Sequence, residues 1–218
     1  MMKLLFTLSF LVFFISCSFV KKPNEWERKS SMSFASYVDA FLSADDYTAK
    51  NSLNRAIKHA KQSSDLDSLA KIYLGECALK SAVGIQTACE KYLSLRELLD
   101  SQELEAYYAF LEGTILSEQL TYLPRQYKPF AMSYGAREYE VAKKRLFEIE
   151  NAASFLIAAQ MMREYLDAND REKILNRASE NGYKKVILFW LDESKKRSSI
   201  KSEINQIEKK ISILNSKE

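Results

Sequence analysis

The chain has 218 residues, which is enough for a single domain with a substantial hydrophobic core. Five glycines and three prolines are too few for the many turns of an all-β fold or the phosphate loops of a doubly wound fold, so the composition favours helices. The formal net charge is only +3, with both signs interspersed, and we therefore expect no nucleic-acid partner.

The first residues have the layout of an export signal. Lys3 precedes an apolar run over residues 4–15, and Ser16 and Cys17 close that run. About a dozen apolar residues match the hydrophobic region of a signal peptide and fall short of the roughly 20 that a spanning helix needs.

This layout resembles a bacterial lipoprotein signal. The resemblance implies that residues 1–16 are a signal peptide and that Cys17 carries the lipid. Phe14 stands where such signals usually have leucine, and Ser18 after the cysteine implies the outer membrane, facing the periplasm. A multiply acylated cysteine would keep the protein on the bilayer. An uncleaved N-terminal anchor and an ordinary cleaved secretory signal are the alternatives.

Residues 17–33 are predicted to form a lipidated tether. Lys21, Lys22 and Pro23 belong to a polar stretch that cannot bury enough apolar area to fold by itself. The helical domain is therefore expected to begin at Phe34.

From Phe34 onward, apolar residues recur at intervals of three and four, which is the spacing of amphipathic helices. Ser, Asp and Gly interrupt this pattern at 43–46, 63–65, 83–84 and 100–101, where they can cap or end helices. The helices expected in this part of the chain fall within residues 34–42, 49–60, 66–79 and 85–98.

The same spacing continues after residue 100, with one interruption. An apolar stripe covers residues 104–120, and helix is expected again over residues 139–166. Residues 121–137 are the least regular segment, because Pro124 and Pro129 exclude one uninterrupted helix.

Two stretches resemble tetratricopeptide-type repeats. They are Leu69, Tyr73, Leu74, Gly75 and Ala78, and later Leu175, Ala178, Gly182, Val186 and Phe189. Gly75 stands where that family keeps a small residue so that two helices can approach. The resemblance covers about half of the chain, although the period of about 34 residues is not kept. It implies an all-α fold over residues 34–198, a right-handed array of antiparallel helix hairpins (an α-solenoid). An irregular α-helical domain is the alternative.

Residues 199–218 are predicted to form a separate amphipathic helix. Its apolar residues follow a heptad spacing over only about two heptads: Ile200, Ile204, Ile207, Ile211 and Leu214. The helix is expected to cap the open end of the array. The alternative is a homodimer formed through residues 200–214.

Two cysteines remain once Cys17 is assigned to the lipid. Cys77 and Cys89 are expected on successive helices, at similar distances from a turn near Gly84. An antiparallel hairpin could bring them level, and a disulfide then requires α-carbons within roughly 7 Å. The pair is either a disulfide, which an exported compartment permits, or two buried thiols.

The sequence offers little chemistry for catalysis. His59 is the single histidine, which excludes a two-histidine zinc site, and there is no glycine-rich phosphate loop. We expect no metal and no cofactor. Glu112, Glu118 and Glu138 are the candidates if the protein is a hydrolase, although such carboxylates usually belong to solvated helix faces.

The segment 121–139 interleaves aromatic and basic residues, a composition typical of binding surfaces. A long irregular segment within a helical array is also often functional. The alternative is that these rings pack beneath the segment. The expected partner-contact residues are Tyr122, Arg125, Tyr127, Lys128, Tyr134 and Arg137.

Together these features predict a membrane-anchored scaffold of the cell envelope without catalytic activity. Stacked helix pairs leave a concave face that can hold a protein or peptide partner. The alternatives are an envelope hydrolase acting on peptidoglycan and a structural subunit that dimerises through its C-terminal helix.

Overall fold

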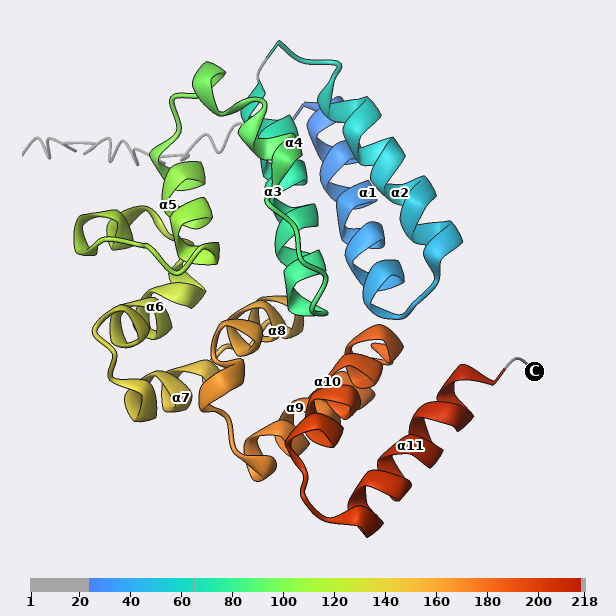
Figure 1. Cartoon of the computed structure of the whole chain (residues 1–218). Helices are drawn as coiled ribbons and strands as arrows, with labels where there is room; N and C mark the ends of the chain where they lie inside the picture. The colour runs from blue at the N-terminus through green and yellow to red at the C-terminus, as the bar shows by residue number, and fades with distance from the viewer. Residues whose placement is uncertain (1–23, 65, 217–218) are drawn as a thin grey trace, which may run out of the picture.

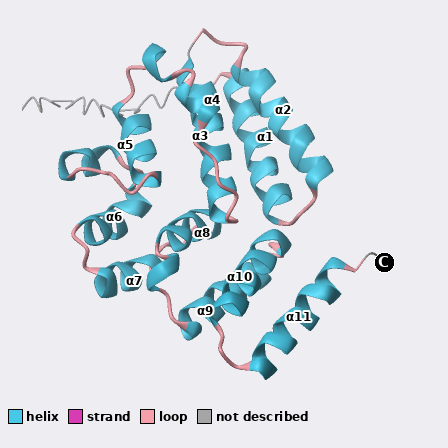
Figure 2. Cartoon of the chain, viewed as in Figure 1, coloured by secondary structure: helices cyan, strands magenta, loops and turns pink. Residues whose placement is uncertain are grey.

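The computed structural model describes residues 24–64 and 66–216, and none of them lies in a β-strand (Figure 2). The expected all-α class is confirmed. The expected signal peptide and Cys17 lie outside the described residues. The helices are α1 (Glu25–Leu42), α2 (Asp46–Ala60), α3 (Leu66–Ala82), α4 (Glu90–Leu93), α5 (Gln102–Leu111), α6 (Lys128–Gly135), α7 (Tyr139–Phe147), α8 (Ala152–Met161), α9 (Ala168–Glu180), α10 (Lys184–Arg197) and α11 (Lys201–Asn215). Short 3₁₀ helices are η1 (Arg96–Leu98), η2 (Ser117–Tyr122), η3 (Arg125–Tyr127) and η4 (Arg163–Tyr165).

Helix hairpins form much of the molecule, as a helical repeat array would have them. The pairs α1–α2, α6–α7 and α9–α10 each pack side by side (Figure 1). Helices distant in the sequence also meet, because α3 packs on α8 and α1 packs on α10. Helix α8 lies at the centre of these contacts, because it packs against α3, α7 and α9.

The first helix begins earlier than the sequence predicts. Helix α1 starts at Glu25, so residues 25–33 are helical rather than part of the tether. Their polar side chains suit a partly exposed helix, and Ser30 is small enough to be buried against α2. The Ser30 hydroxyl donates to the Ala56 carbonyl oxygen at 2.9 Å. Local composition concealed this packing because the partner helix comes later in the chain.

Several predicted helix boundaries are confirmed at the level of individual hydrogen bonds. Asp45 caps α2 by accepting from the Thr48 amide, and Ser101 caps α5 by accepting from the Leu104 amide. Gly75 permits a close approach, since a Cβ there would lie 2.5 Å from Cζ of Phe34 on α1. Gly182, at φ +68°, forms the turn between α9 and α10.

The prediction of a single helix within residues 85–98 is wrong. Residues 85–89 form an irregular loop, and the helix α4 that follows has only four residues. Cys89, directly before α4, has a left-handed backbone conformation with φ +54°. Cys77 and Cys89 form a disulfide, with α-carbons 5.3 Å apart. The bridge therefore joins α3 to an irregular segment, not to a second helix of a hairpin.

Two longer helices predicted in the middle of the chain are each interrupted. Helix α5 stops at Leu111, and Gly113 follows in a left-handed turn with φ +69°. The helix expected over residues 139–166 divides into α7 and α8, because Asn151 caps α8 by accepting from the Ser154 amide at 2.9 Å.

The hydrophobic core is centred on α8, whose residues 155–159 are all buried. Around it lie fully buried side chains from α6 and α10, including Phe130 and Trp190. Two smaller apolar clusters lie under α3, one facing α4 and α5 and the other facing α2. The arrangement of the helices therefore depends on contacts between helices that are distant in the sequence.

Helix α11 is attached to the edge of the molecule through α10. It has no fully buried residue; Ile204, Ile207, Ile211 and Leu214 are half-buried, whereas Ile213 is 62% exposed. Among the described helices, none has both the length and the apolar character needed to cross a bilayer.

Candidate functional site

The structure divides the six expected contact residues between the core and the surface. Tyr127 is only 2% exposed, and its ring centroid lies 4.8 Å from that of Phe110. Burial raises the pKa of its hydroxyl. Tyr127 therefore holds the irregular segment to α5 and cannot touch a partner, which corrects the prediction for this residue.

Tyr134 and Lys128 also have structural contacts. The half-buried Tyr134 donates its hydroxyl to the Met161 carbonyl oxygen at 3.3 Å, and its ring stacks on Phe130. Lys128 donates from Nζ to the Thr121 carbonyl oxygen at 2.6 Å. The Lys128 bond ties α6 to η2, and the Tyr134 bond ties α6 to α8. Packing of rings beneath the segment therefore describes these two residues better than a partner-contact surface does.

Tyr122, Arg125 and Arg137 remain on the surface, and the structure separates their roles. Tyr122 is 39% exposed at the end of η2. Arg125 lines a cavity of about 740 Å³ formed by η3, the start of α6 and the turn between α7 and α8. Arg137 follows α6 and does not line this cavity.

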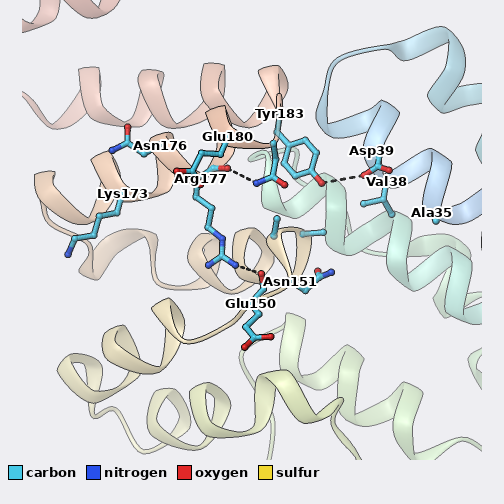
Figure 3. A pocket seen from close by; sticks show the side chains of 13 residues that line it. Ala35, Val38, Asp39, Glu150, Asn151, Lys173, Asn176, Arg177, Glu180 and Tyr183 are labelled. Atoms are coloured by element: carbon cyan, nitrogen blue, oxygen red, sulfur yellow. Dashed lines mark hydrogen bonds between the residues drawn. The ribbon is translucent and has the colours of Figure 1, made fainter.

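A second cavity, of about 800 Å³, lies between α1, the α7–α8 turn, α9 and the start of α10 (Figure 3). Glu150 and Asn151 line both cavities. The two cavities are therefore neighbours across the α7–α8 turn, and together we call them the trough.

Two side chains fix the walls of the trough, as Figure 3 shows. Arg177 on α9 donates to the Glu150 carbonyl oxygen, and its guanidinium lies 4.3 Å from the centroid of the Phe155 ring. Burial lowers the pKa of Arg177. The Tyr183 hydroxyl donates to Asp39 Oδ1 at 3.3 Å, which connects α10 to α1. Burial, and then the Asp39 carboxylate, raise the pKa of Tyr183.

Other polar groups of the trough are available to a ligand. Arg125, Lys173 and Asn176 are all exposed along its walls. Asn151 uses its side-chain oxygen as a helix cap, and within residues 24–64 and 66–216 its amide N–H groups have no acceptor. Amides, cations and carboxylates in one hollow can pair with peptide groups and with charged side chains.

The carboxylates considered for hydrolysis lie in solvent rather than in an apolar pocket. Glu112, Glu118 and Glu138 are all exposed on the surface. The buried Glu76 is paired with Lys80 and Lys91, each at 2.7 Å. Burial alone would raise the pKa of Glu76, but the hydrogen bonds from the two lysines outweigh it and lower the pKa. Glu76 therefore stays ionised, which does not suit a general acid.

The remaining predicted candidates are structural. The half-buried His59 ring places Nδ1 3.3 Å from Gln62 Oε1, a local contact within one helix end. Within the described ranges, no group of three or more histidine, cysteine or acidic side chains is arranged to hold a metal ion.

The sequence analysis missed the residues that form the centre of the trough. Glu150 and Asn151 were assigned to the interior of one long helix, and Lys173 and Arg177 were not singled out. Asn151 carried a usable signal, since asparagine is a preferred N-cap and residues 152–159 after it are almost entirely apolar. No local pattern places α9 opposite that turn.

Comparison with known proteins adds no assignment. No family model, no curated protein and no solved structure matches the chain.

Proposed function

We propose that this protein is a lipid-anchored, non-catalytic scaffold of the bacterial cell envelope, which holds a protein or peptide partner in the trough. The single observation that carries the binding role is the trough itself. Its walls come from four separate parts of the chain, and Arg177 and Tyr183 hold them in place.

The chemistry of the trough fits an extended peptide segment. Side-chain amides of Asn151 and Asn176 can pair with the backbone N–H and C=O groups of such a segment. Arg125 in one cavity and Lys173 in the other can meet acidic side chains, whereas Glu180 can meet basic ones. The walls of the trough are already held in place, so binding costs little conformational entropy and the affinity is higher.

The trough is tested by capture of envelope proteins on the full chain, solubilised in detergent. The test variant carries Arg125→Ala, Lys173→Ala and Asn176→Ala, all at exposed positions. The matched control removes the same kinds of side chain from the exposed face of α2, with Asn54→Ala, Lys58→Ala and Lys61→Ala.

The expected result is that a partner identified by mass spectrometry is lost by the trough variant and kept by the control. Synthetic segments of that partner should then bind the wild type and bind the trough variant at least about tenfold more weakly, the equivalent of about 1.4 kcal/mol. Equal capture by both variants would remove the trough as the binding site.

The envelope location rests on the N-terminal layout, and the disulfide supports it because such bonds persist mainly outside the cytosol. We expect mass spectrometry of the mature N-terminus to find acyl chains on Cys17. We also expect Cys17→Ala to release the protein from membranes. A bare thiol at Cys17 or a retained leader would contradict the lipoprotein assignment.

We also infer that α11 covers α10 rather than forming a dimer seam. The heptad residues Ile204, Ile207 and Ile211 are half-buried, and α10 is the neighbour that α11 contacts. Sedimentation of the full chain should therefore give a monomer. A dimer that Ile200→Lys and Ile213→Lys dissociate would support the alternative of a structural subunit.

A further inference from the structure

Two tyrosines from separate segments of the chain stack on each other at the surface. Tyr139 begins α7 and Tyr165 ends η4, yet their ring centroids are 3.7 Å apart and their planes differ by 16°. Tyr165 is 42% exposed and Tyr139 is half-buried. One face of the pair is thus covered by protein, while ring surface remains open to solvent.

The pair is anchored to the core through further aromatic rings. Tyr134 meets Tyr139 edge-on at 6.0 Å and stacks on Phe130 at 5.6 Å. Phe130 is fully buried. The exposed rings are therefore fixed in position, and a ligand that stacks on them does not have to order them first.

Arg137 precedes Tyr139 by two residues and has an unusual backbone conformation. Its φ of +61° is in the left-handed region, which glycine occupies at lower cost than any residue with a Cβ. Among the described residues its guanidinium forms no hydrogen bond or ion pair, in contrast to Arg145, which is paired with Glu148 at 2.9 Å. Its charge is close enough to oppose the rise in the pKa of Tyr165, which comes first from the hydrogen bond with Tyr139.

We propose that Arg137, Tyr139 and Tyr165 form a second docking surface, separate from the trough, for a proline-containing peptide segment with an isolated acidic side chain. A proline ring is compact and conformationally restricted, and it packs on exposed aromatic rings, as in the recognition of polyproline segments. The free guanidinium can form paired hydrogen bonds with a carboxylate.

The surrounding charges define the ligand further. Glu138 and the exposed Glu140 flank the surface in sequence. Glu140 is paired with Lys143 at 3.3 Å, so Glu138 is the main source of repulsion against a run of negative charge. A single carboxylate between neutral prolines satisfies Arg137 without meeting these acids. The same acids make a polyanion such as a nucleic acid an unsuitable occupant.

The test is an NMR titration of the full chain in detergent, with tyrosine rings isotopically labelled. The probe is a blocked Pro-Pro-Asp-Pro-Pro peptide, and matched peptides carry Asn or Lys in place of Asp. We expect the Asp peptide to shift the Tyr139 and Tyr165 ring signals saturably, with a dissociation constant below about 1 mM. We expect the Asn peptide to bind at least about fivefold more weakly and the Lys peptide to bind more weakly still.

Two variants separate recognition from folding. Tyr165→Ala should weaken binding of the Asp and Asn peptides alike. Arg137→Gly should abolish the preference for Asp over Asn while the melting temperature stays the same or rises, because glycine suits the left-handed backbone. A loss of binding caused by unfolding would lower the melting temperature instead and would count against the proposal.

The trough variant described above distinguishes the two sites. It should bind the Asp peptide as the wild type does, whatever it does to the envelope partner. Absence of saturable shifts, equal affinity for the Asp, Asn and Lys peptides, or loss of binding in the trough variant would each overturn the proposal.

Discussion

The central helices and the connection after α3 are stabilised in different ways. Around α8, long helices bury large apolar side chains such as Phe155 and Trp190. Between α3 and α5, the helices are three or four residues long and enclose a small apolar cluster. There the chain adds a disulfide and buried ion pairs.

The contacts in this connection are specific and few. Cys77 is bonded to Cys89, and Glu76 is paired with Lys91 across the same gap at 2.7 Å. Further along, Tyr92 donates its hydroxyl to Glu105 Oε1 at 2.8 Å, and Arg96 donates from Nε to the same oxygen at 2.9 Å. Segments too short to bury much apolar area are thus held by covalent and charged contacts, whereas the centre depends on packing.

The largest expected effect tests packing at the centre. Trp190→Ala should lower the free energy of unfolding by about 4 kcal/mol, since a large side chain is removed and a cavity remains. Its indole N–H has no hydrogen-bond partner in the described part of the chain, so the loss comes from packing. Urea denaturation measures it. Tyr47→Ala, at an 81% exposed position, is the control and should stay within about 0.5 kcal/mol of wild type. Similar losses for both would contradict a packed centre.

The next effect concerns the disulfide. Replacing Cys77 and Cys89 by serine opens a bridge between residues 12 apart and should cost about 3 kcal/mol in unfolding free energy. Either single replacement should cost about as much as both. Hydrogen exchange should accelerate mainly within residues 84–101. Equal acceleration in α8 would show that the two regions do not differ as described.

The buried ion pair gives a pH-dependent prediction. Glu76→Gln should cost about 2 kcal/mol near neutral pH, because hydrogen bonds to a charged group are lost. The pKa of Glu76 is lowered in the folded protein, so its contribution is present above the unfolded value of about 4.3 and is lost as the pH falls through the folded pKa. Urea denaturation at pH 7 and pH 3 should show the difference between variant and wild type shrinking with acid. A difference independent of pH would contradict the pairing.

The smallest effect compares two glycines with similar backbones. Gly84 has φ +74°, and a Cβ there would fall on the Phe189 ring of α10, whereas a Cβ at Gly182, with φ +68°, meets nothing within 4 Å. Gly182→Ala should therefore cost about 1 kcal/mol from backbone strain alone. Gly84→Ala should cost about 1 kcal/mol more, since the ring has to move. Thermal denaturation of both variants measures the difference, and equal costs would mean that the ring yields freely.

Much of the fold follows from local pattern. The apolar spacing in α2 and α3 and the capping residues Asp45 and Ser101 identified real elements, because each of these signals acts within one or two helical turns. The errors fell where one residue overrides a continuing apolar pattern. Gly113 ends α5 and Asn151 divides α7 from α8, although apolar residues continue on both sides.

The candidate site was less accessible from the sequence. The aromatic and basic residues of segment 121–139 predicted a contact surface, but composition does not tell a core ring such as Tyr127 from a surface ring such as Tyr122. Arg125 was identified as a surface residue in advance. The opposite wall of the trough, with Lys173 and Arg177, belongs to a helix almost fifty residues later, and only packing brings it there.

The sequence by itself determined that the chain is helical, where many helices begin, and that two cysteines could meet, because these properties depend on residues close together in the chain. Only the tertiary structure decided that α3 lies on α8, that α1 closes against α10, and that Tyr139 stacks on Tyr165. Those contacts depend on how buried surfaces from distant segments fit together, and no local spacing encodes that fit.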